Sequence, residues 1–264
     1  MPTVHEIEAA LYAWAPRETA YSWDNVGQLL GDPNCPVERV LVALDITDAV
    51  VEEALAKQCQ LIVAHHPVMN CKWLPVQTVR TDTPQGKLLL NILLNGMNAI
   101  CMHTNLDLAA GGVNDALAER LELVDFAPFE ESGLCRAGYL KRAMPLEEFA
   151  AHVSHKLGCN GLRYADAGKT VSKVAVGGGA CSEYDAAAIA AGCDTFVTSD
   201  VTYHQFLDAK GRGINLIDAG HFPTEDPVCE KIVAYLKEQF PQLYVIKSSV
   251  HKEVIQYHVE DSNR

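Results

Sequence analysis

Ten histidines are spread along this chain of 264 residues, and several follow short apolar runs of the kind that form buried strands. Open α/β sheets bind ligands at the carboxyl ends of their strands, so histidines at such positions are candidates for metal binding or proton transfer. Each position also has a purely structural interpretation. Five histidines lie at or just after a predicted strand end: His65, His66, His103, His204 and His221.

The first cluster is the pair His65 and His66, which ends the apolar run Leu61–Ala64 and precedes Pro67. Proline disfavours helix at the residue before it, so both imidazoles are expected near the carboxyl end of a strand. Adjacent side chains of an extended backbone point to opposite sides, which suits two neighbouring ions better than one. The alternative is a surface or capping pair of histidines.

The second cluster joins His103 and Asp107, which follow the apolar run Ala99–Met102. In an extended chain the two residues would lie about 13 Å apart, so they share a site only if the chain turns at Thr104 and Asn105. The alternative is an Asx-type turn that Asn105 and Asp107 cap.

The third cluster is His221 and Glu225, four residues apart after a predicted strand. Gly220 permits a tight exit from that strand, and across a turn the two side chains are close enough to converge on one ion. The alternative is a helix start, with Thr224 as N-cap, acidic residues in the first turn and Pro227 at a position that needs no N–H.

The joint pattern favours metal binding, because three strand ends each supply histidine and two also supply a carboxylate. This mixed nitrogen and oxygen set suits zinc, iron, manganese or nickel and differs from an all-oxygen magnesium or calcium site. Five protein ligands are too many for an open catalytic zinc site, but they suit two ions bridged by Asp107 and by water or hydroxide. The predicted metal ligands are His65, His66, Asp107, His221 and Glu225.

Short aliphatic runs alternate with segments of helical periodicity, which predicts an α/β fold with a largely parallel sheet. The expected strands are Val40–Leu44, Leu61–Ala64, Ala99–Met102, Val174–Val176, Thr195–Thr198 and Ile214–Ile217. The expected helices are Asp48–Gln58, Thr83–Leu94, Val113–Leu121, Asp185–Ala191 and Tyr203–Ala209, with Asp48 and Thr83 as N-caps.

Residues 126–170 interrupt this alternation and predict a small sub-lobe. We expect two α/β lobes, residues 1–125 and residues 126–264 with the sub-lobe, and the second lobe closes back on the first. The remaining expected elements are the strands Ala137–Arg142, Leu162–Tyr164, Tyr244–Ile246 and Val254–His258 and the helices Pro145–Leu157 and Pro227–Phe240.

Composition excludes several classes of protein. The formal net charge is −13 and no run is rich in Lys or Arg, so nucleic-acid binding is disfavoured. The sequence contains neither an apolar segment of about 18 residues nor a basic leader, which predicts a cytoplasmic protein without membrane contact. The nine cysteines include no C-x-x-C pair. The four in or beside apolar segments are predicted to be reduced core thiols: Cys59, Cys101, Cys181 and Cys193.

Other polar residues near strand ends have structural explanations. Cap or turn roles are expected for Asp24, Asp45, Tyr203 and His204, and surface positions for His251 and His258. The run Gly177–Gly179 either admits a phosphate or makes a tight strand-to-helix turn. The turn is favoured because the G-x-G-x-x-G spacing is absent.

Taken in order, the motifs resemble those of the Nif-three-like family, whose members are often labelled GTP cyclohydrolase I type 2 homologues. The resemblance covers nearly the whole chain. The motifs that carry it are Trp23-Asp-Asn-Val-Gly27, Ala64-His-His-Pro67, His103-Thr-Asn-Leu-Asp107, Gly111-Gly-Val-Asn-Asp115 and Asp218-Ala-Gly-His221 with Glu225.

This resemblance implies two similar α/β lobes around a metal-containing cleft, a toroidal homohexamer and two metal ions per subunit. The family's ligands fall on the same five residues, and His103 matches a site-lining histidine. The chain has the short form, without the inserted domain of longer relatives. It departs from the family at Thr198-Ser199-Asp200, where a Thr-Gly-Asp sequence is common, so we expect an altered backbone at a position whose conformation favours glycine.

Three functions follow as alternatives. The first is a dinuclear metal-dependent hydrolase that acts on a nucleotide or a pterin-precursor ring, with His103 as the catalytic residue and His103 or His204 as proton shuttle. The second is a non-catalytic protein for metal handling or regulation that uses the same ligands. The third is an interaction protein with incidental histidines, which would bind no transition metal.

Overall fold

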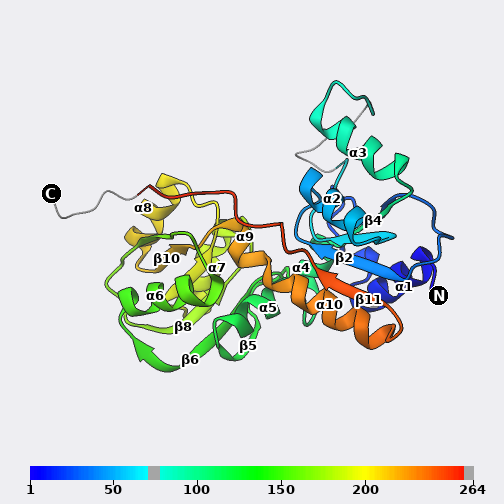
Figure 1. Cartoon of the computed structure of the whole chain (residues 1–264). Helices are drawn as coiled ribbons and strands as arrows, with labels where there is room; N and C mark the ends of the chain where they lie inside the picture. Colours follow the sequence, from blue (N-terminus) through cyan, green and yellow to red (C-terminus); the bar gives the residue numbers. More distant parts are fainter. Residues whose placement is uncertain (71–77, 259–264) are drawn as a thin grey trace. The chain divides into compact units, whose positions relative to one another are not determined.

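The computed structural model describes residues 1–70 and 78–258. The chain forms two compact units, each a mixed sheet with helices packed on it (Figure 1). Each unit is assembled from two separate segments of the chain. The predicted lobe boundary near residue 125 stays a prediction. The units are Met1–Val113 with Val228–His251, and Asn114–Pro227 with Lys252–Arg264.

The first unit is built on a five-stranded sheet in the order β1-β4-β3-β2-β11. The strands from β4 to β11 are parallel, and β1 is an antiparallel edge strand, so the predicted parallel sheet is confirmed in its centre. The strands are β1 (Gly27–Leu30), β2 (Arg39–Ala43), β3 (Leu61–Ala64), β4 (Asn98–Cys101) and β11 (Tyr244–Lys247).

Helices cover both faces of this sheet (Figure 1). On one face, α2 and α3 bury Val51, Leu89 and Ile92 against alternate residues of the central strands. On the other, α1 and α10 meet where the rings of Trp14 and Tyr235 lie 4.8 Å apart. The helices are α1 (Val4–Trp14), α2 (Asp48–Ala56), α3 (Pro84–Leu94), α4 (Thr104–Leu108) and α10 (Pro227–Gln239), with the 3₁₀ helix η1 (Arg17–Thr19).

The second unit is built on a six-stranded sheet in the order β5-β6-β8-β9-β10-β7. Its centre, β8 to β10, is parallel, and the flanking strands are antiparallel. The elements predicted within residues 126–170 therefore join this sheet through β6 and β7. The strands are β5 (Val124–Pro128), β6 (Arg136–Met144), β7 (Arg163–Ala165), β8 (Val171–Val176), β9 (Thr195–Thr198) and β10 (Asn215–Asp218).

Helices α5 and α6 pack through Leu117, Phe149 and Val153 on the core of the second sheet, and α8 contacts β10 and β7. One layer of helices therefore packs directly against the sheet whose parallel strands are β8 to β10. The helices are α5 (Val113–Arg120), α6 (Leu146–Leu157), α7 (Asp185–Ala190), α8 (Tyr203–Arg212) and α9 (His221–Glu225), with the 3₁₀ helix η2 (Ser182–Tyr184).

Three local predictions are wrong. Thr47, and not Asp48, caps α2, because its side chain accepts a hydrogen bond from the amide of Val50. The segment Val254–His258 is irregular: the side-chain amide of Asn160 donates to the carbonyl of Ile255, where a strand would have a backbone partner. The predicted N-cap Thr224 lies inside α9, where its hydroxyl donates to the carbonyl of Gly220.

Other expectations are confirmed. Thr83 caps α3, and His258 is exposed. The four cysteines predicted as core thiols are all buried, and none of the four forms a disulfide. Within the described part of the chain, no helix is long and apolar enough to cross a membrane.

Candidate metal centre

Three adjacent parallel strands of the first unit each place polar side chains just past their carboxyl ends. His65 and His66 follow β3, His103 follows β4, and Asp45 follows β2. The strands pair in register, so their ends lie side by side. One ring nitrogen from each of the three histidines lies within 4.8 Å of the others, an arrangement that could hold a metal ion.

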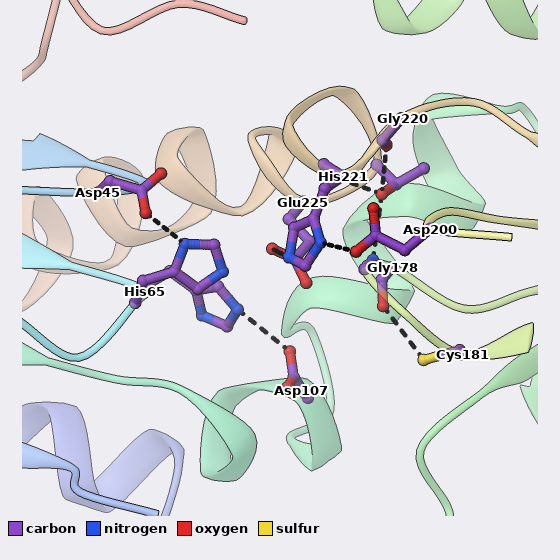
Figure 2. Close-up of polar contacts among 12 residues, drawn as sticks. Asp45, His65, Asp107, Gly178, Cys181, Asp200, Gly220, His221 and Glu225 are labelled. Carbon is purple, nitrogen blue, oxygen red and sulfur yellow. Dashed lines mark hydrogen bonds and ion pairs between the residues drawn. The ribbon is translucent and has the colours of Figure 1, made fainter. Parts of the chain in front are cut away.

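The tautomer of His65 follows from its partners. Its Nδ1 lies 2.7 Å from the carbonyl oxygen of Met102, which can only accept, so Nδ1 donates and Nε2 of the neutral ring carries a lone pair. That Nε2 lies 3.4 Å from Oδ1 of Asp107, which is also an acceptor (Figure 2). Two acceptors repel each other, so a cation or a proton between or beside these atoms would stabilise the arrangement.

The one-turn helix α4 brings Asp107 back toward the histidines. His103 precedes the helix, and the amide of Asp107 donates to the carbonyl of His103 at 3.0 Å. The predicted turn at Thr104 and Asn105 is confirmed, and it takes the form of this helix.

Asp45 connects two histidines that are far apart in the sequence. Its Oδ1 accepts from Nδ1 of His66 at 2.7 Å, and its Oδ2 accepts from Nε2 of His251 at 3.0 Å. Burial opposes ionisation of Asp45, but the bonds from His251 and His66 outweigh it and hold the pKa of the carboxyl well below its usual range. The predicted surface position of His251 is wrong: only 10% of its side chain is exposed.

Asp24 fixes His103 in a similar way. Both of its carboxylate oxygens lie 2.9 Å from Nδ1 of His103, and the amide and hydroxyl of Thr104 donate to Oδ2. Burial opposes ionisation here too, but the His103 and Thr104 hydrogen bonds lower the pKa of Asp24 to about 2. The predicted cap role is confirmed, and Asp24 additionally orients a candidate catalytic histidine.

The second unit carries the other two predicted ligands on α9. His221 and Glu225 lie one helical turn apart, and Nε2 of His221 is 3.1 Å from Oε2 of Glu225. On its other side, Nδ1 of His221 lies 2.7 Å from Oδ2 of Asp200, which follows β9 (Figure 2). Burial disfavours the imidazolium, but Glu225 and Asp200 outweigh it and raise the pKa of His221 to about 11. The two carboxylates thus favour the protonated form of this histidine when no metal ion is bound.

The glycine run after β8 lies directly beside these two ligands. Its three amides donate to protein acceptors: Gly177 to Val197, Gly178 to Asn114 and Gly179 to Thr224. These bonds occupy the amides that a phosphate would need, and the chain continues into η2 and α7. The tight turn is therefore confirmed.

The departure at Thr198-Ser199-Asp200 leaves the local backbone without strain at Ser199. The residue with a left-handed conformation is Asp200, at φ 54°, and Ser199 has no positive φ. Aspartate tolerates this region better than most residues do. Ser199 is fully buried, and its amide donates to the carbonyl of Gly179 at 3.0 Å.

The predicted ligands fall into two groups, each held within its own unit. The donor set fits divalent transition metals, because imidazole nitrogens and carboxylates are paired at short range and their outer nitrogens are fixed by carboxylates or a carbonyl. His204 is exposed on α8, with its ring edge-on to that of Tyr203, so its predicted role as a proton shuttle has no support from its position in its own unit.

The sequence alone does not show that four further residues orient the candidate histidines or their carboxylate partners: Asp24, Asp45, Asp200 and His251. Two signals were available in the sequence: the strand end beside Asp45 and the Trp23-Asp24-Asn25 motif. Neither signal indicates which histidine the aspartate contacts. The partners are 79 residues apart for Asp24 and 206 residues apart for the bond between Asp45 and His251.

Parallel strand ends that carry oriented histidines and carboxylates define an α/β protein with donor groups suited to divalent metals. The chain belongs to the Duf34/NIF3 (NGG1p interacting factor 3) family, whose model matches residues 2–254. This confirms the family resemblance seen in the sequence.

Two curated relatives carry the name GTP cyclohydrolase 1 type 2 homolog. The protein from Clostridium perfringens is 34% identical over 232 residues, which cover 85% of this chain and 87% of the relative. The protein from Streptomyces coelicolor is 36% identical over 250 residues, which cover 90% and 87%. A crystal structure of a Bacillus cereus protein related to NIF3 matches with a TM-score of 0.89 at 26% identity and covers 98% of this chain and 99% of that one.

Proposed function

We propose that the chain binds two divalent transition-metal ions per subunit and uses them to hydrolyse a small molecule, with a nucleotide as the first candidate. Zinc, iron, manganese and nickel all suit the donor set. The residues that would hold the ions are His65, His66, Asp107, His221 and Glu225.

The observation that best supports the proposal is the approach of His65 to Asp107. A lone pair on Nε2 and a carboxylate oxygen face each other at 3.4 Å around a fully buried imidazole. A divalent cation beside both atoms would turn this repulsion into two favourable bonds. The names of the curated relatives support a nucleotide substrate.

When bound, a metal pair polarises an electrophilic centre and brings the pKa of a coordinated water into the working range. His103, which is not assigned as a ligand, and the aspartates behind the histidines then have distinct roles. Asp24 fixes Nδ1 of His103, so Nε2 of His103 is the atom that gives or takes a proton during hydrolysis. Asp45 and Asp200 each hold Nδ1 of their histidine, which would leave Nε2 of His66 and His221 to bind the ions.

The metal content of purified protein tests the binding half of this proposal. We expect about two transition-metal ions per chain. His65→Ala and Glu225→Gln should each lose at least one. His5→Ala is the matched control, because the His5 side chain is 72% exposed and lies far along the chain from the ligands. Wild-type protein without transition metal after growth in metal-replete medium would refute the proposal.

Turnover tests the catalytic half. Metal-loaded protein should hydrolyse GTP steadily, His65→Ala should abolish the activity, and His103→Ala should retain metal while losing most of the rate, about 100-fold or more. Bound metal with no turnover of any nucleotide would favour the second candidate, a protein that carries or inserts metal. Exchange would support that outcome if the metal passes to a competing apo-protein within minutes.

We also propose a toroidal homohexamer in the cytoplasm. The resemblance of the sequence motifs to the family implies this assembly, and buried cysteines outside disulfides support a reducing compartment. Light scattering coupled to gel filtration should give six times the 28.8 kDa chain mass. A monomer under all metal conditions would contradict the assembly without affecting the metal assignment.

A further inference from the structure

A tight turn of the first unit, Tyr21–Asp24, places two aromatic rings beside the candidate site; we call it the aromatic turn. The amide of Asp24 donates to the carbonyl of Tyr21 at 2.9 Å and closes the turn. Thr104 then holds both ends: its hydroxyl accepts from the amide of Tyr21, and its amide and hydroxyl donate to Asp24. The turn is therefore rigid and is fixed to the residue that follows His103.

Trp23 lies within this turn and is 41% exposed. Its ring centroid lies 5.8 Å from that of Tyr21 and 6.0 Å from that of His103, at an interplanar angle of 70° to the imidazole. The His103 ring in turn lies 5.1 Å from His65 and 5.7 Å from His66. A large exposed indole thus extends the group of imidazoles at the strand ends.

Trp14 shows how the same residue type behaves in a structural role. Its indole N–H donates to the carbonyl of Ala110 at 2.9 Å, and its ring packs on Tyr235. Trp23 belongs to a turn that Thr104 holds at both ends, and its side chain is 41% exposed. Exposed tryptophan on a rigid support is typical of binding surfaces, because the ring offers a large contact area and loses little conformational entropy on binding.

We propose that Trp23 is a stacking platform for the planar heteroaromatic ring of the molecule hydrolysed at this site, an inference that rests on the proposed function. Stacking on an indole face is favourable for any purine or pterin-like ring and needs no hydrogen-bond pattern. Tyr21 supports the indole from its own position in the turn. Trp23 therefore selects substrates with a ring and does not discriminate one base from another.

Calorimetric titration of metal-loaded protein with guanosine monophosphate tests the platform. Trp23→Ala should weaken binding by about 5- to 100-fold, the range found for loss of one stacked base. Trp23→Phe keeps an aromatic face and should stay within about threefold of wild type. Ribose 5-phosphate, which has no base, should bind equally to all three proteins. Equal affinity of wild type and Trp23→Ala for guanosine monophosphate would overturn the proposal, and so would a wild type that binds no ring-bearing probe.

Intrinsic fluorescence provides an independent readout. Guanosine monophosphate should quench wild-type emission, and Trp23→Phe should lose that component while it still binds the nucleotide. Trp14→Phe is the matched control and should retain the quenching, because the Trp14 ring packs on Tyr235 and its N–H is bonded to the carbonyl of Ala110. Undiminished quenching in Trp23→Phe would overturn the assignment.

Metal content and turnover separate this proposal from the one on which it rests. Trp23→Ala should retain the wild-type metal content, because the indole supplies no ligand atom. Ring-dependent binding without hydrolysis would refute the hydrolase and leave the platform standing. Hydrolysis of guanosine triphosphate with unchanged KM in Trp23→Ala would do the reverse.

Discussion

A β-carbon on Gly179 would lie 2.2 Å from Oε1 of Glu225 and 3.2 Å from Nε2 of His221. Gly179 also has a φ of +66°, a conformation that residues with a β-carbon rarely adopt. The bare backbone after β8 is therefore what permits the carboxylate of Glu225 to occupy its position. The glycine run therefore has a structural explanation that does not involve a bound phosphate.

The first prediction concerns Gly179→Ala. The added methyl displaces Glu225, so we expect metal affinity to fall by about 10- to 100-fold, as for loss of an orienting contact. The left-handed backbone adds roughly 1–2 kcal/mol of destabilisation. Chelator competition and urea unfolding measure the two effects.

Gly168→Ala is the matched control, because Gly168 has a φ of +74° and a β-carbon there would meet nothing within 4 Å. It should show the loss of stability and keep the metal affinity. Wild-type affinity in Gly179→Ala would show that Glu225 does not need this position to bind metal.

The second prediction concerns the link between Asp45 and its two histidines. Asp45→Asn places an amide where both His66 and His251 donate, so at least one ring loses its acceptor. We expect metal affinity to fall by about 10- to 100-fold, measured by chelator competition. Asp82→Asn removes a comparable charge from an exposed pair with Arg80 and should change nothing measurable. Equal affinities of the two variants would contradict the orienting role.

The candidate ligands could be predicted from the sequence because parallel strands bring their carboxyl ends together. Each apolar run, such as Leu61–Ala64, is buried on both faces, so it can be predicted as a strand from its own residues, without knowledge of the neighbouring strands. The polar residues that follow each run are then placed at one edge by topology alone. His65 and His103 are placed in this way at the edge of the first sheet, and His221 in the same way after β10 of the second sheet.

The orienting residues could not be predicted, because a local sequence pattern does not show which distant segments of the chain pair with each other. Asp45 and His251 are brought together by the pairing of β11 with β2, and nothing in either segment states that pairing. The helix α1 was also missed, although its capping box between Thr3 and Glu6 is a local signal. The alternation in Val254–His258 predicted a strand, but no described strand pairs with this segment.

The third prediction concerns Glu53 on α2, which ties down the chain after β11. Its carboxylate accepts hydrogen bonds from the hydroxyls of Ser248 and Ser249 and from the amide of Ser249. Burial opposes its ionisation, but these bonds outweigh it and lower the pKa of Glu53 below its usual 4.5. A lowered carboxyl pKa stabilises the fold above the unfolded-state pKa, and this stabilisation is lost as pH falls through the folded-state pKa.

Glu53→Gln should therefore lower the free energy of unfolding at pH 7 by about 1–3 kcal/mol, the range for hydrogen bonds to a charged group. The difference from wild type should shrink as pH falls from 4.5 through the lowered folded-state pKa, because only below that lower pKa is the carboxyl of the folded wild type protonated as well. Urea unfolding across this pH range measures both. Glu52→Gln, at an exposed position of the same helix, should show neither effect. A difference that does not vary with pH would contradict the role of the ionised carboxylate.

The fourth prediction separates the neighbours Ser199 and Asp200. Because the left-handed residue is Asp200, Ser199→Gly relieves no strain; it should cost at most about 1 kcal/mol and leave metal affinity unchanged. Asp200→Asn tolerates the same backbone but replaces the carboxylate that accepts from Nδ1 of His221. It should lower metal affinity by about 10-fold or more at nearly unchanged stability.

Chelator competition and urea unfolding on the two variants give a double test. The reverse result, with metal affinity sensitive to Ser199→Gly and indifferent to Asp200→Asn, would mean that the loop acts through its backbone and not through the carboxylate. The expected result would explain how serine is accommodated at the position where the family resemblance implies glycine. The position that must tolerate φ 54° belongs to the next residue, which also holds the histidine.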